Sequence, residues 1–330
     1  MTSVGLPTPS AGFRRPLLPG DRAFLIASRL TALVVIVVVL SLASPYFLTT
    51  GNLTNVLRQA ALQFLMSAGL TIVVLTGGID LSIGAVLGLA ACLGASLIAT
   101  GDVLPGIIAA LAVGLACGIV NGVLVAYVRL PPFIATYGML WIAFGLGYVF
   151  MRGSVIYGMP DEFRFIGAGF VGPVPVPIIV ALLLLAALVV LLRYTPLGRA
   201  FYAIGGNVQA ARLSGMPVRR RTMAAYAISG LLAGFAGLVV IARTNAADAG
   251  LGEELLLPTI AAVVLGGTSL MGGVGGVVGT AIGSLILALI VNGMNLTGIG
   301  TYWQAGALGL LIILSVLADE IVARRGRSQT

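Results

Sequence analysis

The chain has 330 residues, of which 59% are hydrophobic and only 8% are charged, against roughly 25% charged residues in an ordinary soluble domain. Because so apolar a chain cannot cover its surface with polar groups, we predict an all-α integral membrane protein that is solvated by lipid. The net charge of +8 comes from arginines that lie between the hydrophobic runs, so topology explains it and no nucleic-acid partner is expected.

The residues that usually carry chemistry are scarce. There is no His and no Lys, and the two cysteines, Cys92 and Cys117, lie inside apolar runs. The missing His removes the commonest general base and metal ligand, and without Lys there is no GxxxxGK[ST] phosphate loop. The cysteines are interpreted as small core residues. We therefore expect no catalytic residue, no metal and no cofactor in this chain, and any ATP and Mg would be bound by a partner.

About ten membrane spans are predicted, since each needs about 20 apolar residues. The first apolar run is interpreted as a retained span, because it is too long for a signal peptide and no A-x-A site follows it. The spans form a single transmembrane domain, 26–320, between an N-terminal segment, 1–25, and a tail, 321–330. The candidate spans are 26–48, 57–76, 82–100, 106–128, 132–151, 174–193, 222–242, 256–271, 277–295 and 301–318.

Arginine clusters predict the orientation of these spans, because positive charge near span ends marks the cytoplasmic side. One cluster precedes the first span, one lies in a central loop at about 194–221, and one follows the last span. Even numbers of predicted spans separate the clusters, so all three can lie in the cytoplasm together with both termini. The clusters are Arg14, Arg15 and Arg22, then Arg193, Arg199, Arg212, Arg219, Arg220 and Arg221, then Arg324, Arg325 and Arg327.

Glycine is abundant, with 46 residues, about twice the usual share. Several glycines recur four residues apart, which places them on one helix face and lets helix backbones approach closely in lipid. The simplest interpretation is packing, and the alternative is a smooth contact along which helices slide during transport. VVLTGG at 73–78 returns as VVLGG at 263–267, which indicates either an internal duplication or coincidence. The expected packing glycines are Gly84, Gly88, Gly114, Gly118, Gly122, Gly275, Gly279 and Gly283.

One carboxylate, Asp80, lies within the small, apolar stretch TGGIDLSIGAVLGLAA at 76–91. A charge at mid-bilayer costs about 2.5–3.5 kcal/mol on insertion scales, so Asp80 is not expected to face lipid. One interpretation makes it an interfacial turn residue before a helix that Ser82 caps, stabilised by the helix dipole. The other places it in the bundle interior beside a translocation path. The residues alone leave both open.

Four stretches carry a resemblance to a known family: TGGIDLSIGAVLGLAA, GRAFYAIGGNVQAARLSGMPV at 198–218, AAVVLGGTSLMGGVGGVVGTAIGSLI at 261–286 and NGMNLTGIGTYWQ at 292–304. Together they resemble the permease subunits of bacterial ATP-binding-cassette (ABC) importers for monosaccharides of the ribose, xylose, arabinose and galactose type. The likeness runs in order from about residue 45 to 318.

The resemblance implies an inner-membrane importer with the ABC permease fold, built from two permease subunits and two ATPase subunits. It also implies a periplasmic or lipid-anchored sugar-binding protein that delivers the substrate. This chain would then be no enzyme itself. ATP hydrolysis in the partner would drive alternating access.

In this family a short cytoplasmic coupling helix docks into a groove on each ATPase, and the central loop matches that segment. The local sequence agrees, because Asn207 is a good N-cap, and Gly215 and Pro217 end a helix after about two turns. The alternative is a solvated loop without a partner. Ala210, Ala211 and Leu213 are expected to face the groove. The implied coupling positions are Asn207, Val208, Gln209, Ala210, Ala211, Arg212, Leu213, Ser214 and Gly215.

Sugar contacts are expected from amides, carboxylates and aromatic rings in or near the spans. Each candidate also has a structural interpretation, as an interfacial anchor for an aromatic residue or an interhelical hydrogen bond for Asn. Two other functions stay open: a branched-chain amino-acid permease of the same superfamily, and an ion-coupled secondary transporter that relies on Asp80. The candidates for the translocation path are Asp80, Ser82, Asn121, Tyr137, Trp141, Asn292 and Asn295, with Trp303 near them.

Overall fold

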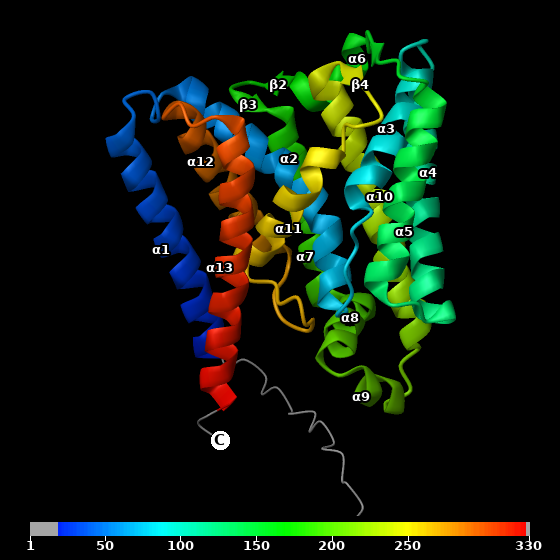
Figure 1. Cartoon of the computed structure of the whole chain (residues 1–330), viewed down its shortest axis with the longest axis vertical. Helices are drawn as coiled ribbons and strands as arrows, with labels where there is room; N and C mark the ends of the chain where they lie inside the picture. Colours follow the sequence, from blue (N-terminus) through cyan, green and yellow to red (C-terminus); the bar gives the residue numbers. More distant parts are fainter. Residues whose placement is uncertain (1–18, 328–330) are drawn as a thin grey trace, which may run out of the picture.

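The computed structural model describes residues 19–327, which form a bundle of helices that run roughly along its longest axis (Figure 1). Two pairs of short strands and two non-α helical turns, η1 and η2, complete the described chain. In chain order the elements are α1 (Pro19–Ala43), α2 (Thr50–Leu75), α3 (Ile83–Ile98), α4 (Val103–Val123), η1 (Leu124–Val128), α5 (Pro132–Met151), β1 (Ile156–Tyr157), α6 (Asp161–Ala168), β2 (Phe170–Val171), β3 (Val174–Pro175), α7 (Val176–Tyr194), α8 (Pro196–Gly206), α9 (Val208–Leu213), α10 (Val218–Thr244), β4 (Ala246–Ala247), η2 (Glu253–Leu255), α11 (Leu256–Leu265), α12 (Val277–Leu296) and α13 (Thr301–Arg327).

Each of the ten predicted spans coincides with a helix, although the helices differ in length. Among the described residues, six helices are long and apolar enough to cross a membrane: α2, α4 with η1, α5, α7, α10 and α12. Shorter apolar stretches lie in α1, α3 and α13. The chain is therefore a multi-pass membrane protein of the all-α class, and the count of ten crossings stays a prediction.

Several predicted boundaries differ from the structure. Helix α1 begins at Pro19 and α2 at Thr50, both before the predicted starts at 26 and 57. The span expected at 256–271 is a helix only to Leu265, because Gly267 adopts a φ of +68° and turns the chain away from the helix axis. The span expected at 301–318 belongs to a helix that continues to Arg327, beyond the predicted start of the tail. Arg14 and Arg15, and most of the predicted N-terminal segment, lie outside the described residues.

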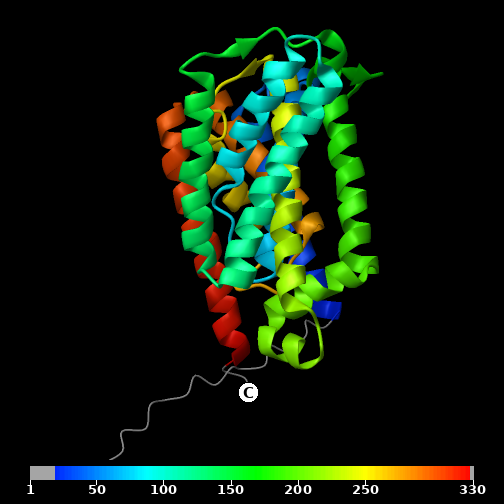
Figure 2. The ribbon, with the colours of Figure 1, turned by 90° about the vertical axis from the view of Figure 1, so that its right-hand side faces the viewer.

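The arginine-rich segments of the described chain lie at one end of the bundle. The start of α1, the pair α8 and α9, and the end of α13 share this end in two perpendicular views (Figures 1 and 2). The opposite end carries α6 and the strand pairs β1–β4 and β2–β3, both antiparallel. This arrangement is the one that even numbers of spans between the arginine clusters require.

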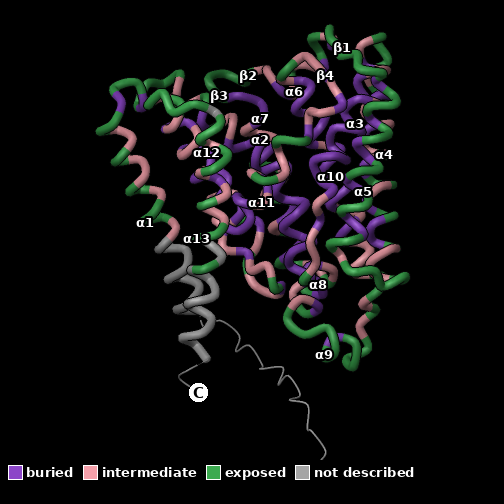
Figure 3. Tube along the Cα trace, in the orientation of Figure 1, coloured by how far each residue is buried: buried purple, intermediate pink, exposed green. Residues whose placement is uncertain are grey.

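The core follows α2, α3, α10 and α11, whose traces are mostly buried, whereas α1, α5 and α13 present exposed faces (Figure 3). Glycines let α4 approach α10 at backbone distance. A Cβ on Gly118 would collide with the Tyr226 carbonyl oxygen, and one on Gly114 would collide with that of Gly230. Large apolar side chains cover the outward faces, such as Val149, which is 74% exposed. Such faces suit lipid rather than water.

Candidate functional site

The chain between α2 and α3 is a non-helical segment inside the bundle. Helix α2 ends at Leu75, where Gly77 adopts a φ of +78° that other residues rarely take. Residues 78–82 then belong to no helix, and α3 begins at Ile83. In Figure 1 this segment rises from the level of α8, near the lower end of the bundle, towards α3 in the upper half. We call residues 78–82 the Asp80 segment.

Hydroxyl and amide groups surround the Asp80 carboxylate, which is only 2% exposed. Oδ1 accepts hydrogen bonds from the Ser82 hydroxyl at 2.7 Å and from the Ser82 backbone N–H at 3.1 Å. Oδ2 accepts one from the Ser229 hydroxyl of α10 at 2.9 Å. These donors compensate part of the cost of burying a charge.

Asn121 of α4 extends this cluster. Its Nδ2 donates to the Ser82 hydroxyl at 2.8 Å, and its own Oδ1 is buried without a hydrogen-bond partner among the described residues. An amide carbonyl in that state is an acceptor available to an incoming donor. Three of the predicted path residues thus form one hydrogen-bonded chain, in which Ser82 links Asp80 to Asn121, and Ser229 joins it through Asp80.

The structure combines parts of both interpretations of Asp80. The residue does precede the N-terminus of α3, as the turn interpretation requires, but it is buried in the bundle rather than interfacial. Ser82 occupies the N-cap position, yet its side chain makes no capping hydrogen bond. The expectation that its hydroxyl caps α3 was wrong, because that hydroxyl is engaged by Asp80 and Asn121.

Two further side chains hold the Asp80 segment through its backbone. The Tyr226 hydroxyl of α10 donates to the Ile79 carbonyl at 3.3 Å, and the Thr136 hydroxyl of α5 approaches the same oxygen at 3.4 Å. Both side chains belong to buried faces of their helices. No sequence pattern indicated Tyr226, Thr136 or Ser229, because a single polar residue in an apolar helix carries no spacing signal.

The aromatic candidates lie elsewhere. Tyr137 and Trp141 project from the exposed face of α5, with exposed fractions of 45% and 60%. With Phe133 they form a row: the Phe133 and Tyr137 rings stack at 5.7 Å between centroids, and Tyr137 and Trp141 meet edge-on at 6.2 Å. They do not reach the Asp80 cluster in this structure.

The remaining amide candidates join helices. Asn292 of α12 exchanges two side-chain hydrogen bonds with Asn52 of α2, at 2.7 and 3.1 Å. The Asn295 Oδ1 accepts a bond from Gln304 of α13 at 2.7 Å. Both contacts are of the interhelical kind that Asn commonly makes in membrane proteins.

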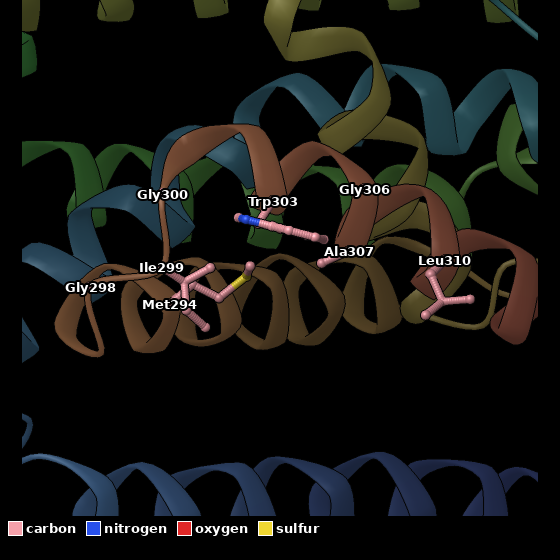
Figure 4. Close-up of a pocket in the computed structure, with 8 residues that line it drawn as sticks. All are labelled: Met294, Gly298, Ile299, Gly300, Trp303, Gly306, Ala307 and Leu310. Atoms are coloured by element: carbon pink, nitrogen blue, oxygen red, sulfur yellow. The ribbon is translucent and has the colours of Figure 1, made fainter.

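A hollow of about 830 Å³ opens between the end of α12 and the start of α13 (Figure 4). It contains Trp303 but no carboxylate or amide side chain, so it offers few groups for binding sugar hydroxyls. Its lining residues are Met294, Gly298, Ile299, Gly300, Trp303, Gly306, Ala307 and Leu310.

The central loop folds into two short helices, α8 and α9, of which only the second was predicted from the sequence. The Asn207 side chain accepts hydrogen bonds from the backbone N–H groups of Gln209 and Ala210, both at 3.0 Å, which caps α9. Gly215, with a φ of +79°, follows its end. The local prediction of a capped helix that stops before Gly215 therefore agrees with the structure.

The expected orientation of α9 needs a correction. Ala211 is 5% exposed and faces the molecule, so it does not offer surface to a groove. Leu213, 89% exposed, and Val208, 43% exposed, are the outward apolar side chains. Asn207, Gln209, Ala210, Arg212, Ser214 and Gly215 are also exposed.

The predicted packing glycines mostly lie at close backbone contacts. A Cβ on Gly279 or Gly283 of α12 would collide with carbonyl oxygens of α11 and its end, and one on Gly122 would lie 2.9 Å from the Met223 Cα. Gly84 faces the turn at Gly252 rather than a helix, and Gly88 has ordinary clearance of 3.4 Å from the Ala249 carbonyl. Gly275 precedes α12 and cannot belong to its face.

The fold is that of a multi-pass membrane protein with a buried polar cluster, and comparison with known proteins makes this specific. A family described as "Branched-chain amino acid transport system / permease component" matches residues 52–316. The chain belongs to this family of ABC importer permeases and is a transport subunit.

Several of its relatives are named as sugar permeases. The ribose import permease protein of Escherichia coli (strain K12) is 42% identical over 88% of this chain and 92% of its own length. The ribose import permease protein of Bacillus subtilis (strain 168) is 42% identical over 87% and 90%. The D-allose transport system permease protein of Escherichia coli (strain K12) is 38% identical over 86% and 88%. No solved structure is a significant match.

Proposed function

We propose that this chain passes a monosaccharide across the bacterial inner membrane by alternating access. The observation that carries the proposal is 42% identity with ribose import permeases over nearly the whole chain. The family description names branched-chain amino acids, but relatives at 36–42% identity include permeases named for ribose, allose and galactose. An ion-coupled transporter would leave this kinship and the capped α9 unexplained.

The same proposal implies the partners. An ATPase subunit that binds ATP and Mg docks at the end that carries α9, which is then the cytoplasmic end with both termini. A periplasmic or lipid-anchored sugar-binding protein delivers substrate at the end that carries α6. A second permease, identical or related, completes the transporter.

We assign the Asp80 cluster to a position beside the translocation path. A carboxylate, an amide with an unpartnered oxygen and two hydroxyls are the groups that bind sugar hydroxyls, and they meet here inside the bundle. Tyr137 and Trp141 contribute to the same path only where the exposed face of α5 borders a second permease.

The test is uptake into vesicles that contain the chain with its co-purified partners. We expect ATP-dependent accumulation of ribose, allose or galactose when the binding protein is present. Accumulation of leucine but of no sugar would favour the amino-acid alternative. Accumulation driven by an ion gradient without any ATPase would overturn the importer proposal.

Coupling through α9 has its own test. Leu213→Asp places a charge on the most exposed apolar side chain of α9, so we expect loss of ATPase co-purification while the permease itself still folds. Leu130→Asp is the matched control, because Leu130 is 37% exposed in the turn between α4 and α5 and belongs to no proposed contact. Equal ATPase recovery with both variants would remove α9 from the coupling interface.

A further inference from the structure

Three backbone segments from distant parts of the sequence meet beside α9. They are the end of α2 at Leu75 with the following Gly77, Gly205 in the last turn of α8, and Gly272 with Gly273 in the loop between α11 and α12. The Gly273 backbone N–H donates to the Leu75 carbonyl at 3.0 Å, which ties the first segment to the third. We call these five residues the glycine junction.

The junction is packed backbone against backbone. A Cβ on Gly205 would collide with the Leu75 carbonyl oxygen and would lie 2.5 Å from the Gly273 nitrogen. A Cβ on Gly272 would lie 2.7 Å from the Gly77 nitrogen and 2.9 Å from the Gly205 Cα. No side chain fits between the three backbone segments. A displacement of one segment against another therefore cannot be absorbed by a change of side-chain rotamer.

The junction has α9 on one side and the Asp80 segment on the other. Two residues after Gly205, Asn207 caps α9, and no flexible linker intervenes. Three residues after Gly77 comes Asp80, held by Ser229 of α10. One more hydrogen bond joins α8 to the loop between α11 and α12 outside the junction: the Tyr202 hydroxyl donates to the Gly275 carbonyl at 3.0 Å.

We propose that the glycine junction transmits the movement of α9 to the Asp80 segment, and that Gly205 is the positioning residue on which this transmission depends. The inference rests on the proposed docking of an ATPase on α9. When α9 is displaced, the backbone of Gly205 pushes directly on Leu75 and Gly273. The turn after α2 and the loop after α11 then move together, and the Asp80 segment is carried with them.

Two neighbouring glycines provide a matched test. Gly205→Ala places a methyl group into the junction, whereas a Cβ on Gly206 has no atom within 4 Å. In vesicles that hold the whole transporter, we expect Gly205→Ala to retain its ATPase partner and hydrolyse ATP but to lose most of the sugar taken up per ATP. Gly206→Ala should keep the native ratio.

The outcomes separate the two proposals. If the unaltered chain recovers no ATPase, the proposed function fails before the junction is tested. If the unaltered chain couples normally and Gly205→Ala keeps the native ratio of uptake to hydrolysis, the junction proposal is overturned.

A second measurement covers the case in which Gly205→Ala does not fold. Spin labels at the exposed positions Gln209 and Met271 report the distance between α9 and the loop after α11, in a chain whose Cys92 and Cys117 are replaced by Ala. Gln209 is used because it is not one of the outward apolar side chains of α9. We expect this distance to be unchanged between nucleotide-free and ATP-bound transporter, while the distance from Gln209 to the exposed Tyr302 shifts.

A change in the first distance between nucleotide states would show that α9 slides against the junction, and would overturn the proposal. So would the absence of any shift in the second distance, because α9 would then have no movement to transmit.

Discussion

The turns after α2 and after α11 have the same backbone pattern and lead to different structures. In the first, the Gly77 N–H bonds the Val74 carbonyl and the Gly78 N–H bonds the Val73 carbonyl. In the second, Gly267 bonds Val264 and Thr268 bonds Val263, at equivalent positions. Gly77 and Gly267 have φ values of +78° and +68°. The weak repeat in the sequence is therefore a repeat of structure.

The two turns differ in the segment that each one leads into. After Gly78 the chain enters the bundle, where Asp80 binds hydroxyl groups from Ser82, just before α3, and from Ser229 of α10. After Gly267 it forms a glycine-rich loop without a charge, pinned where the Thr268 hydroxyl accepts a bond from the Gly276 N–H at 3.2 Å. The same turn conformation thus leads into a polar segment after α2 and into an uncharged, glycine-rich loop after α11.

The largest loss of stability is expected from a substitution at the contact between α4 and α10, the helix that binds the segment after the first turn. Gly118→Leu places a side chain against the Tyr226 carbonyl, so we expect a loss of more than about 3 kcal/mol and failure to purify a folded chain. Gly145→Leu, on the exposed face of α5 with no atom near its Cβ, is the control. Equal thermal stability of both variants in detergent would contradict this packing.

The next largest loss of stability is expected from substitutions that remove the Asp80 carboxylate, which follows the first turn. Asp80→Ala leaves the Ser82 and Ser229 donors without their acceptor, at about 1–3 kcal/mol for each buried group. Asp80→Asn keeps one oxygen acceptor and should lose less. Thermal unfolding in detergent measures both, and an Asn variant less stable than the Ala variant would refute the assigned hydrogen bonds.

A smaller loss of stability is expected from substitutions of the two glycines that end α2 and α11, Gly77 and Gly267, and it compares the two turns directly. Gly77→Ala is expected to cost about 1–2 kcal/mol through left-handed strain alone, since a Cβ there has 3.6 Å of clearance. Gly267→Ala adds a collision with the Arg29 guanidinium and should cost more. Gly77→Asn should recover part of the loss, because Asn tolerates this conformation. Equal melting temperatures for the two Ala variants would contradict the difference.

The smallest effect concerns the far ends of the helices that flank the turns. Asn292→Ala removes its two bonds with Asn52 and should cost about 1 kcal/mol. Asn295→Ala, which loses only the exposed bond to Gln304, should cost less. The melting temperatures of these two variants rank the contacts, and the reverse order would contradict the assigned burial.

The sequence predicted the helices well because their apolar length and glycine stops are local signals. It also placed Asp80 beside Ser82, because residues two positions apart in the chain must lie close in space. It could not show that Ser229 completes the cluster, because the approach of α10 depends on tertiary packing. It failed for Ala211 because α9, at six residues, is too short for a periodic pattern to indicate which face is buried.

The position of the two tryptophans has a practical consequence. Trp141 and Trp303 are 60% and 75% exposed, on different helices, and the described core contains neither. The fluorescence of this protein should therefore report on its surroundings, with emission that brominated lipids quench wherever lipid touches α5 or α13. A chain that covered either helix would shield its indole, so the protein already carries a separate optical probe on each of these two faces.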